Sequence, residues 1–293
     1  MSFYLTAVLL GLGFASLALG IFITMRIFNI PDITTDGSFT LGGAITAVML
    51  MNDASLPLIV LSVFAGGAVA GSLTGFIHTK MKVNALLAGI LVMTALYSVN
   101  LSIMGRSNIP LMNGKNIFES MNIFQDSLMQ QLLVLIIFSV LLWLLLSRLL
   151  ATDFGLSMRA TGNNENMIRA LGVNTDRMKI IGIALANGLI ALSGFLITQI
   201  QGFADISMGI GIVILGLGSV MIGEISMTLF PRAKIGWHLL AAIIGSIVFR
   251  FILAFALLLG IDALYLKLVV AVFVLIVISI PNLPFGKNLK RIS

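Results

Sequence analysis

The sequence is poor in charge and contains no cysteine. Among 293 residues, 10% are charged and 59% are hydrophobic, whereas charged residues make up about a quarter of a typical soluble domain. Without cysteine, the chain can form no disulfide, thiolate metal site or cysteine nucleophile. Its two histidines, His78 and His238, stand singly, so we expect no metal site.

Two catalytic patterns are also missing from the sequence. No G-x-x-x-x-G-K-[ST] phosphate-binding loop occurs, so we do not expect the chain to hydrolyse ATP itself. No nucleophile–base pair or metal constellation can be recognised either, which argues against an intramembrane enzyme. We therefore expect neither an enzyme nor a bound cofactor.

Long apolar runs fill most of the chain. Each is long enough to cross a hydrocarbon core about 30 Å thick as a helix, and lipid leaves the backbone no hydrogen-bonding partner except itself. The sequence therefore predicts an all-α integral membrane protein, with one transmembrane domain over residues 1–293. We expect about nine spans, at residues 3–24, 33–51, 57–78, 83–105, 128–148, 180–200, 209–226, 237–259 and 264–280.

Basic residues are distributed unevenly among the predicted loops. One side carries Arg26, Lys80, Lys82, Arg148, Arg159, Arg169, Arg177, Lys179, Arg232, Lys234, Lys287, Lys290 and Arg291, and the other carries Arg106, Lys115 and Lys267. By the positive-inside rule the first side is cytoplasmic. The N-terminus is then outside and the tail 281–293 inside. This distribution accounts for the net charge of +6 without a nucleic-acid partner.

Two polar interruptions resemble each other. Asp36 and Ser38 in the first half, and Asp205 and Ser207 in the second, form an Asp-x-Ser that leads into a glycine-rich apolar helix. The two following helices run in opposite directions, as an inverted repeat requires, and transporters place such interrupted helices around a central solute site. Alternatively, Asp36 and Asp205 are plain N-caps at the membrane surface.

The inverted repeat predicts how the chain is divided. The parts are a first repeat at 1–127 with an outer loop at 106–127, a crossing span at 128–150, a cytoplasmic loop at 151–179 and a second repeat at 180–280.

Two further features concern helix packing. Gly67, Gly71 and Gly75 form a small-residue ridge, which suits either internal helix packing or a subunit interface.

Glu224 and Arg250 are ionisable groups at or within spans. Because such groups are costly in lipid, they are expected to form an intramembrane ion pair or to line the transport path.

The polar loop at 151–179 is predicted to contain one helix of about eight residues. Asn163 or Asn164 suits its N-cap, Glu165 its first turn and Gly172 the position after its end.

This helix has one apolar face. Met167, Ala170 and Leu171 are spaced to share it, and a helix so short is marginal alone in water. Its apolar face therefore needs a groove, either on a partner or on the protein's own inner surface.

Three segments resemble a known family of transport proteins. Residues 159–174, RATGNNENMIRALGVN, resemble the coupling loop of permease subunits of bacterial ABC importers. Residues 30–43, IPDITTDGSFTLGG, and 216–224, GLGSVMIGE, are similar to the branched-chain amino acid and ribose permease superfamily, in its tryptophan/tyrosine-type branch. The resemblance covers essentially the whole chain.

The resemblance implies partners. The expected assembly is a homodimer or paired permease in the bacterial plasma membrane, with two cytoplasmic ATPase subunits and an external solute-binding lipoprotein. The short helix would dock in a cleft of the ATPase. The coupling residues would be Gly162, Asn163, Asn164, Met167, Ile168, Arg169, Ala170, Leu171 and Gly172.

The resemblance also implies a solute path. It would run past Asp36, Ser38 and Thr40, and the repeat adds Asp205 and Ser207. The solute would be a small organic molecule such as an amino acid. The alternative function is an ion-coupled secondary transporter, in which Asp36, Asp205 or Glu224 would carry the ion.

Overall fold

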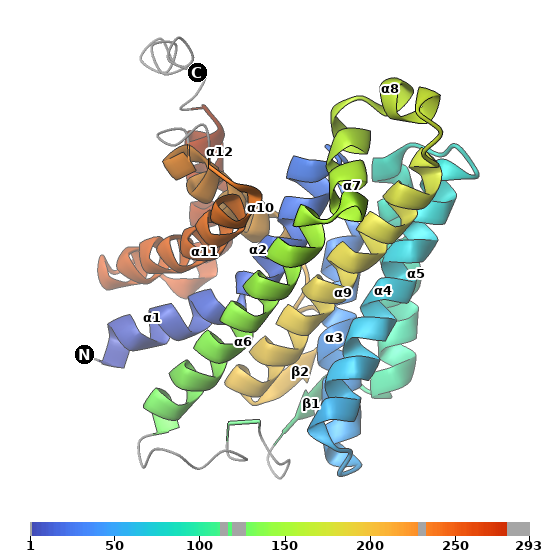
Figure 1. Cartoon of the computed structure of the whole chain (residues 1–293). Helices are drawn as coiled ribbons and strands as arrows, with labels where there is room; N and C mark the ends of the chain where they lie inside the picture. The colour runs from blue at the N-terminus through green and yellow to red at the C-terminus, as the bar shows by residue number, and fades with distance from the viewer. Residues whose placement is uncertain (1, 112–116, 119–126, 228–232, 280–293) are drawn as a thin grey trace.

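The computed structural model describes residues 2–111, 117–118, 127–227 and 233–279, which form a body of packed helices (Figure 1). In the first half these are α1 (Ser2–Gly13), α2 (Ala15–Ile21), the π-helix η1 (Phe22–Ile27), α3 (Thr34–Met51), α4 (Leu56–Thr79) and α5 (Ala85–Met104). Then follow α6 (Ser127–Ala151), α7 (Asp153–Asn163), α8 (Glu165–Ala170), α9 (Thr175–Gln201), α10 (Ile212–Met227), α11 (Ile235–Leu258), the 3-10 turn η2 (Ala263–Tyr265) and α12 (Leu266–Ser279).

Each predicted span coincides with a helix, the first with the run from α1 to η1. Six segments are long and apolar enough to cross a membrane: Phe3–Ile27, Leu56–Thr79, Ala85–Met104, Ser127–Ala151, Thr175–Gln201 and Ile235–Leu258. The apolar helices α10 and α12 are shorter. A multi-pass membrane architecture follows, and the count of nine crossings stays a prediction.

A two-stranded sheet is the only β-structure that the described residues show. Strands β1 (Asn108–Pro110) and β2 (Phe203–Asp205) pair antiparallel, with Ile109 opposite Ala204. The sheet lies at the end of the helical body opposite to α7 and α8 (Figure 1). Part of the predicted outer loop, 112–116 and 119–126, and the tail 281–293 lie outside the described residues.

Helix α9 lies at the centre of the fold. It packs against α2, α3 and α4 (Figure 1), and small residues let the backbones approach closely. A Cβ added to Gly42 of α3 would lie 2.0 Å from the Ala191 carbonyl oxygen, and one added to Gly194 would lie 2.0 Å from the Phe39 carbonyl oxygen. The α3–α9 contact is therefore backbone against backbone.

The glycine ridge of α4 faces α9 as well. An added Cβ would lie 2.4 Å from the Asn187 carbonyl oxygen at Gly67 and 2.4 Å from the Ile183 carbonyl oxygen at Gly71. Gly75 meets the Cα of Ile180 at 2.8 Å. The ridge was predicted to serve either internal helix packing or a subunit interface, and in the structure it packs internally against α9.

Helix α10 begins later than predicted, beside the first turn of α3. The predicted span starts at residue 209, but residues 206–211 form turns, and Gly211 has a φ of +86°. These turns lie along α3, since a Cβ on Gly209 would be 2.0 Å from the Asp36 carbonyl oxygen. The first turns of α3 and α10 are thereby brought together.

We predict that Gly67→Ala lowers the thermal unfolding temperature of the detergent-solubilised protein. The new methyl group has no space against the α9 backbone, and overpacking of this kind costs about 1–3 kcal/mol. Gly66→Ala in the same helix is the matched control, because its Cβ would approach only side-chain atoms, the nearest being the flexible Cδ1 of Ile45. Equal losses in the two variants would contradict this account of the α4–α9 contact.

Candidate functional site

The polar loop forms two helices, α7 and α8, rather than the single short helix predicted. The Thr152 hydroxyl caps α7 by accepting a hydrogen bond from the Gly155 N–H at 3.3 Å. Helix α7 buries Met158 and Thr161. It was missed because glycines at 155 and 162 weaken a helical pattern, although the i, i+4, i+7 spacing of Phe154, Met158 and Thr161 was a signal for it.

Helix α8 matches the predicted helix. Asn164, not Asn163, is the N-cap: its Oδ1 accepts a hydrogen bond from the Met167 N–H at 3.0 Å. Gly172 follows the helix with a φ of +88°, a conformation that favours glycine. The helix has six residues and ends at Ala170.

The apolar face of α8 points into solvent. Met167 is 53% exposed and Leu171 71% exposed, and Ala170 is exposed between them. Ile168 on the other side is buried and holds α8 on the protein. One alternative was that this face lies on the protein's own inner surface. The structure contradicts it, because Met167, Ala170 and Leu171 are all exposed.

A charged network fixes α8 to its neighbours. Glu165 accepts hydrogen bonds from Arg169 at 2.8 Å and from Lys179 of α9 at 2.5 Å. Asp176 pairs with Lys80 of α4 at 2.8 Å and with Arg169 at 3.5 Å. Arg169 thus joins α8 to the start of α9, and its charge points away from the exposed apolar face.

These pairs shift the carboxyl pKa values. The hydrogen bond from Lys179 is the main reason that the pKa of Glu165 lies below its ordinary 4.5. The hydrogen bond from Lys80 likewise lowers the pKa of Asp176 below 3.8. Both carboxylates are therefore held in their charged form at neutral pH.

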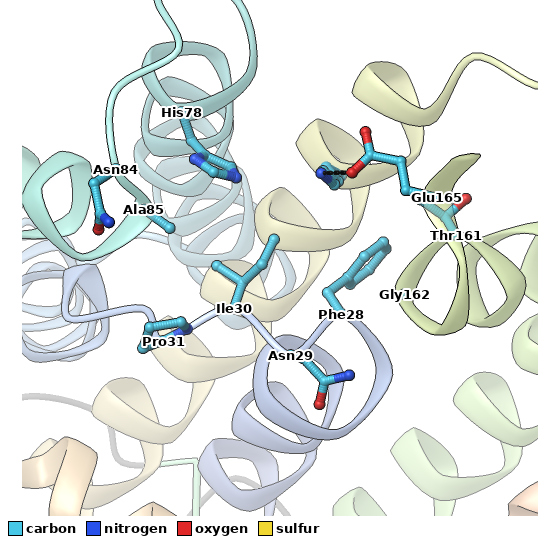
Figure 2. A pocket seen from close by; sticks show the side chains of 11 residues that line it. Phe28, Asn29, Ile30, Pro31, His78, Asn84, Ala85, Thr161, Gly162 and Glu165 are labelled. Carbon is cyan, nitrogen blue, oxygen red and sulfur yellow. Dashed lines mark hydrogen bonds and ion pairs between the residues drawn. The ribbon is translucent and has the colours of Figure 1, made fainter. Parts of the chain in front are cut away.

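Gly162 connects this loop to the break before α3. A Cβ on Gly162 would lie 1.7 Å from the carbonyl oxygen of Ile27, the last residue of η1. A pocket of about 370 Å³ opens beside this contact. The consecutive residues Phe28, Asn29, Ile30 and Pro31 line one part of it (Figure 2). The rest of the lining consists of His78, Asn84, Ala85, Thr161, Gly162, Glu165 and Lys179.

A buried polar network joins α3 to the middle of α9. Asn187 donates to Asp32 Oδ2 at 2.7 Å and accepts from the Ser38 hydroxyl at 2.7 Å. Asp32 Oδ1 accepts from the Thr34 N–H at 2.9 Å. Sequence reasoning missed Asp32 because it stands in a segment that reads as a loop, although Asp two residues before a helix is a capping signal.

Asp36 lies in the first turn of α3, but its side chain caps the start of α10. Its two carboxylate oxygens accept hydrogen bonds from the N–H groups of Gly211 at 2.9 Å and Val213 at 3.0 Å, at the start of α10. The Thr40 hydroxyl donates to the Asp36 carbonyl oxygen within α3 at 3.0 Å. Ser38 and Thr40 are buried, and Asp36 is partly exposed.

Asp205 and Ser207 lie at the end of β2, a strand that contacts α3, and they hydrogen-bond to each other. Asp205 accepts hydrogen bonds from the Ser207 N–H at 2.8 Å, from the Ser207 hydroxyl and from the Asn108 amide at 3.2 Å. The Ser207 hydroxyl is the main cause that lowers the pKa of Asp205. The five predicted path residues therefore lie on adjoining segments, but the described residues show no hydrogen bond between Asp205 or Ser207 and Asp36, Ser38 or Thr40.

The predicted pair of Glu224 and Arg250 is wrong. Glu224 pairs with Arg26 at 3.0 Å and with His238 at 3.3 Å, and the Arg250 guanidinium lies over the Phe14 ring, 3.9 Å from its centre. Helices α10 and α11 are antiparallel, with Gly223 beside Ala241. Arg250 is nine residues beyond Ala241, so at 1.5 Å per residue it lies roughly 13 Å further along the helix.

The described side chains offer no evident metal centre. No group of three His, Cys, Asp or Glu residues in the described ranges could hold a metal ion. The carboxylates of the site instead accept hydrogen bonds from backbone and side-chain donors, which suits structural capping and helix coupling.

The chain matches a family model and several curated relatives. Residues 3–279 match the family described as branched-chain amino acid transport system / permease component. The tyrosine transport system permease protein of Clostridioides difficile (strain R20291) is 39% identical over 91% of this chain and 87% of that protein. The autoinducer 2 import system permease protein LsrC of Salmonella choleraesuis (strain SC-B67) is 29% identical over 72% of this chain and 59% of that protein.

A solved structure resembles the fold. It is described as a metal-chelate type ABC transporter in an inward-facing conformation, and it aligns with a TM-score of 0.52 and 14% identity. The alignment covers 95% of this chain and 83% of the other.

We predict that Glu165→Gln removes a pH-dependent part of the stability. Because the folded-state pKa of Glu165 is lowered, its stabilisation is present above pH 4.5 and is lost as the pH falls through the folded-state value. Each exposed ion pair contributes about 0.2–1 kcal/mol. Thermal unfolding between pH 7 and pH 3 should show the wild type and the variant converging at low pH.

Asp153→Asn is the control for this pH series. Asp153 is an exposed carboxylate on the same hairpin, and it makes no ion pair with the described residues. A wild-type advantage over Glu165→Gln that stays constant down to pH 3 would contradict the ion-pair account.

A second prediction concerns the cap on α10. Asp36→Ala removes both acceptors and should destabilise the protein by about 1 kcal/mol, whereas Asp36→Asn keeps one acceptor oxygen and should lose less. Thermal unfolding of the two variants, with solute uptake measured in parallel, checks this order. If Asp36→Asn folds and transports normally, Asp36 acts as a cap alone.

Proposed function

Because this chain belongs to the branched-chain amino acid transport system permease family, we propose that it forms the solute path of an ATP-driven importer. The family consists of transport components rather than enzymes. The chain is accordingly a multi-pass permease of the plasma membrane. Its solute, its partners and its orientation belong to the proposal.

The observation that carries the proposal is the exposed apolar face of α8. Met167, Ala170 and Leu171 are exposed on a helix whose other side is anchored by Ile168 and by the Glu165 network. An apolar helix face held rigidly in solvent suits a groove on a partner. That partner would be an ATPase subunit, and a homodimer or paired permease would bind two of them.

The route from α8 into the membrane is short. Gly162 packs on η1, η1 leads into α3, and Asp36 of α3 holds the first turn of α10. A movement of α8 driven by an ATPase would therefore reach the first turns of α3 and α10. The proposed solute path runs there, past Asp36, Ser38 and Thr40 and on to Asp205 and Ser207.

The solute is proposed to be an amino acid, with tyrosine as the first candidate. This rests on the printed name of the relative that is 39% identical. An external solute-binding lipoprotein would deliver it on the side opposite to α8.

The inverted repeat remains part of the proposal. Helix α9, which begins the second half, packs against α3 and α4 of the first. The first half begins with α1 and α2, and these pack in turn against α10 and α11 of the second. In each half, therefore, the first membrane helix packs against the second and third membrane helices of the other half. This reciprocal packing is what an inverted repeat would produce, and it supports the repeat. The basic residues on the α7–α8 side support a cytoplasmic position for that side.

The ion-coupled alternative has no support from the site. An ion-carrying carboxylate must be free to change partners, whereas Asp36, Asp205 and Glu224 each accept two or more contacts within the protein.

We predict that Met167→Asp abolishes solute-coupled ATP hydrolysis and tyrosine uptake when the permease is co-reconstituted with its ATPase and binding protein. A charge in the apolar face would remain unpaired in the ATPase groove. Membrane insertion and thermal stability should stay unchanged, because Met167 is exposed.

Met81→Asp is the matched control. Met81 is 63% exposed, lies between Lys80 and Lys82 on the same side of the molecule, and is not part of α8. Met81→Asp should keep transport near the wild-type rate. Normal transport by Met167→Asp, or uptake without ATP, would overturn the proposal.

A further inference from the structure

A second pocket lies on the α7 side of the molecule, outside the proposed solute path. Its volume is about 330 Å³, at the lower end of the roughly 300–1,000 Å³ typical of small-ligand sites. Three elements from different parts of the chain meet around it, namely η1, α7 and the start of α11. Its lining consists of Phe22, Arg26, Ile27, Asn29, Arg159, Asn163, Ile235 and His238.

The charge in this pocket is positive and incompletely balanced. Glu224 pairs with Arg26 and contacts His238, so this carboxylate already has its partners and does not serve Arg159. Arg159 has no hydrogen-bond or ion-pair partner among the described residues, and its Nε is buried.

A buried guanidinium N–H without an acceptor is costly. The pocket beside Arg159 leaves room for a ligand that supplies this acceptor. Arginine presents its donors in a planar fork that matches a phosphate group. Two arginines from different helices, with the amides of Asn29 and Asn163 beside them, offer donors from several directions. The same chemistry does not suit a cation or an apolar ligand.

The pocket also lies at the level expected for phospholipid headgroups. Ile235 and His238 of its lining lie in the first turn of α11, a helix long and apolar enough to cross a membrane. The Trp143 indole donates to the Gly236 carbonyl oxygen at 2.8 Å, and Trp237 is exposed next to His238. Tryptophans gather at membrane interfaces. Phe22, Ile27 and Ile235 give the pocket an apolar side, as a lipid would need.

We infer that this pocket binds the phosphate group of an anionic ligand, with Arg159 and Arg26 as its principal donors. A phospholipid headgroup from the adjacent leaflet is one source of such a phosphate, and soluble phosphate is the other. Bound there, the phosphate joins η1, α7 and α11, and so ties both halves of the fold to the hairpin that carries α8.

The two tryptophans of the chain make the inference testable, since both lie beside this pocket. Brominated phosphatidylglycerol, titrated into the detergent-solubilised full chain, should quench their fluorescence. Half-quenching should require about tenfold less of it than of brominated phosphatidylcholine. Arg159→Gln should remove this preference. Arg148→Gln should keep it, because it loses the same charge at an exposed position on the same side outside the pocket.

Inorganic phosphate distinguishes the two sources. If the phosphatidylglycerol preference is present in the wild type and lost in Arg159→Gln, the ligand is a lipid headgroup. If that preference is absent but millimolar phosphate raises the unfolding temperature of the wild type and not of Arg159→Gln, the source is soluble phosphate. If neither occurs, or if Arg159→Gln and Arg148→Gln behave alike, the inference is overturned.

Arg159→Lys keeps the test decisive should Arg159→Gln fail to fold. Lysine retains the charge without the planar fork, so binding should weaken severalfold but persist. Wild-type affinity in a folded Arg159→Lys, together with wild-type affinity in Arg26→Gln, would contradict the assignment of these two donors.

Discussion

The fold depends on satisfying backbone N–H groups where helices begin inside a membrane protein. Lipid offers these groups no acceptor, so the acceptor must come from within the chain, and at two helix starts it is a carboxylate. Asp32 accepts the N–H of Thr34 at the start of α3, and Asp36 accepts those of Gly211 and Val213 at the start of α10. The second contact joins residues 175 positions apart, so it holds the two halves together.

Close backbone packing makes these contacts possible. Gly42, Gly194 and Gly209 leave no room for a side chain where α3 meets α9 and the turns before α10. Asn187 of α9 can then reach both Asp32 and Ser38. Glycine in this chain is thus a packing requirement at the centre, while its conformational freedom matters at positions such as Gly172 and Gly211.

The hairpin of α7 and α8 combines a rigid base with an open face. Ion pairs to α4 and α9 fix the base, and the apolar side chains of α8 stay in solvent. The phosphate pocket adjoins the same hairpin through Arg159 and Asn163. A partner on one face and an anion beside the other would therefore act on the same pair of short helices, and through Gly162 on the interior.

The sequence by itself determined the membrane class, the approximate positions of the long apolar helices, the glycine that follows α8 and the identity of its apolar face. Those features depend on local composition, on helical spacing and on capping residues within a few positions, which a linear sequence displays. Only the tertiary structure decided that Asp36 caps α10, that Asp32 is buried against Asn187, and that Glu224 pairs with Arg26 and His238 instead of Arg250. These contacts join residues far apart in the chain, and they are set by which helices lie adjacent and at what height, information that no local pattern carries.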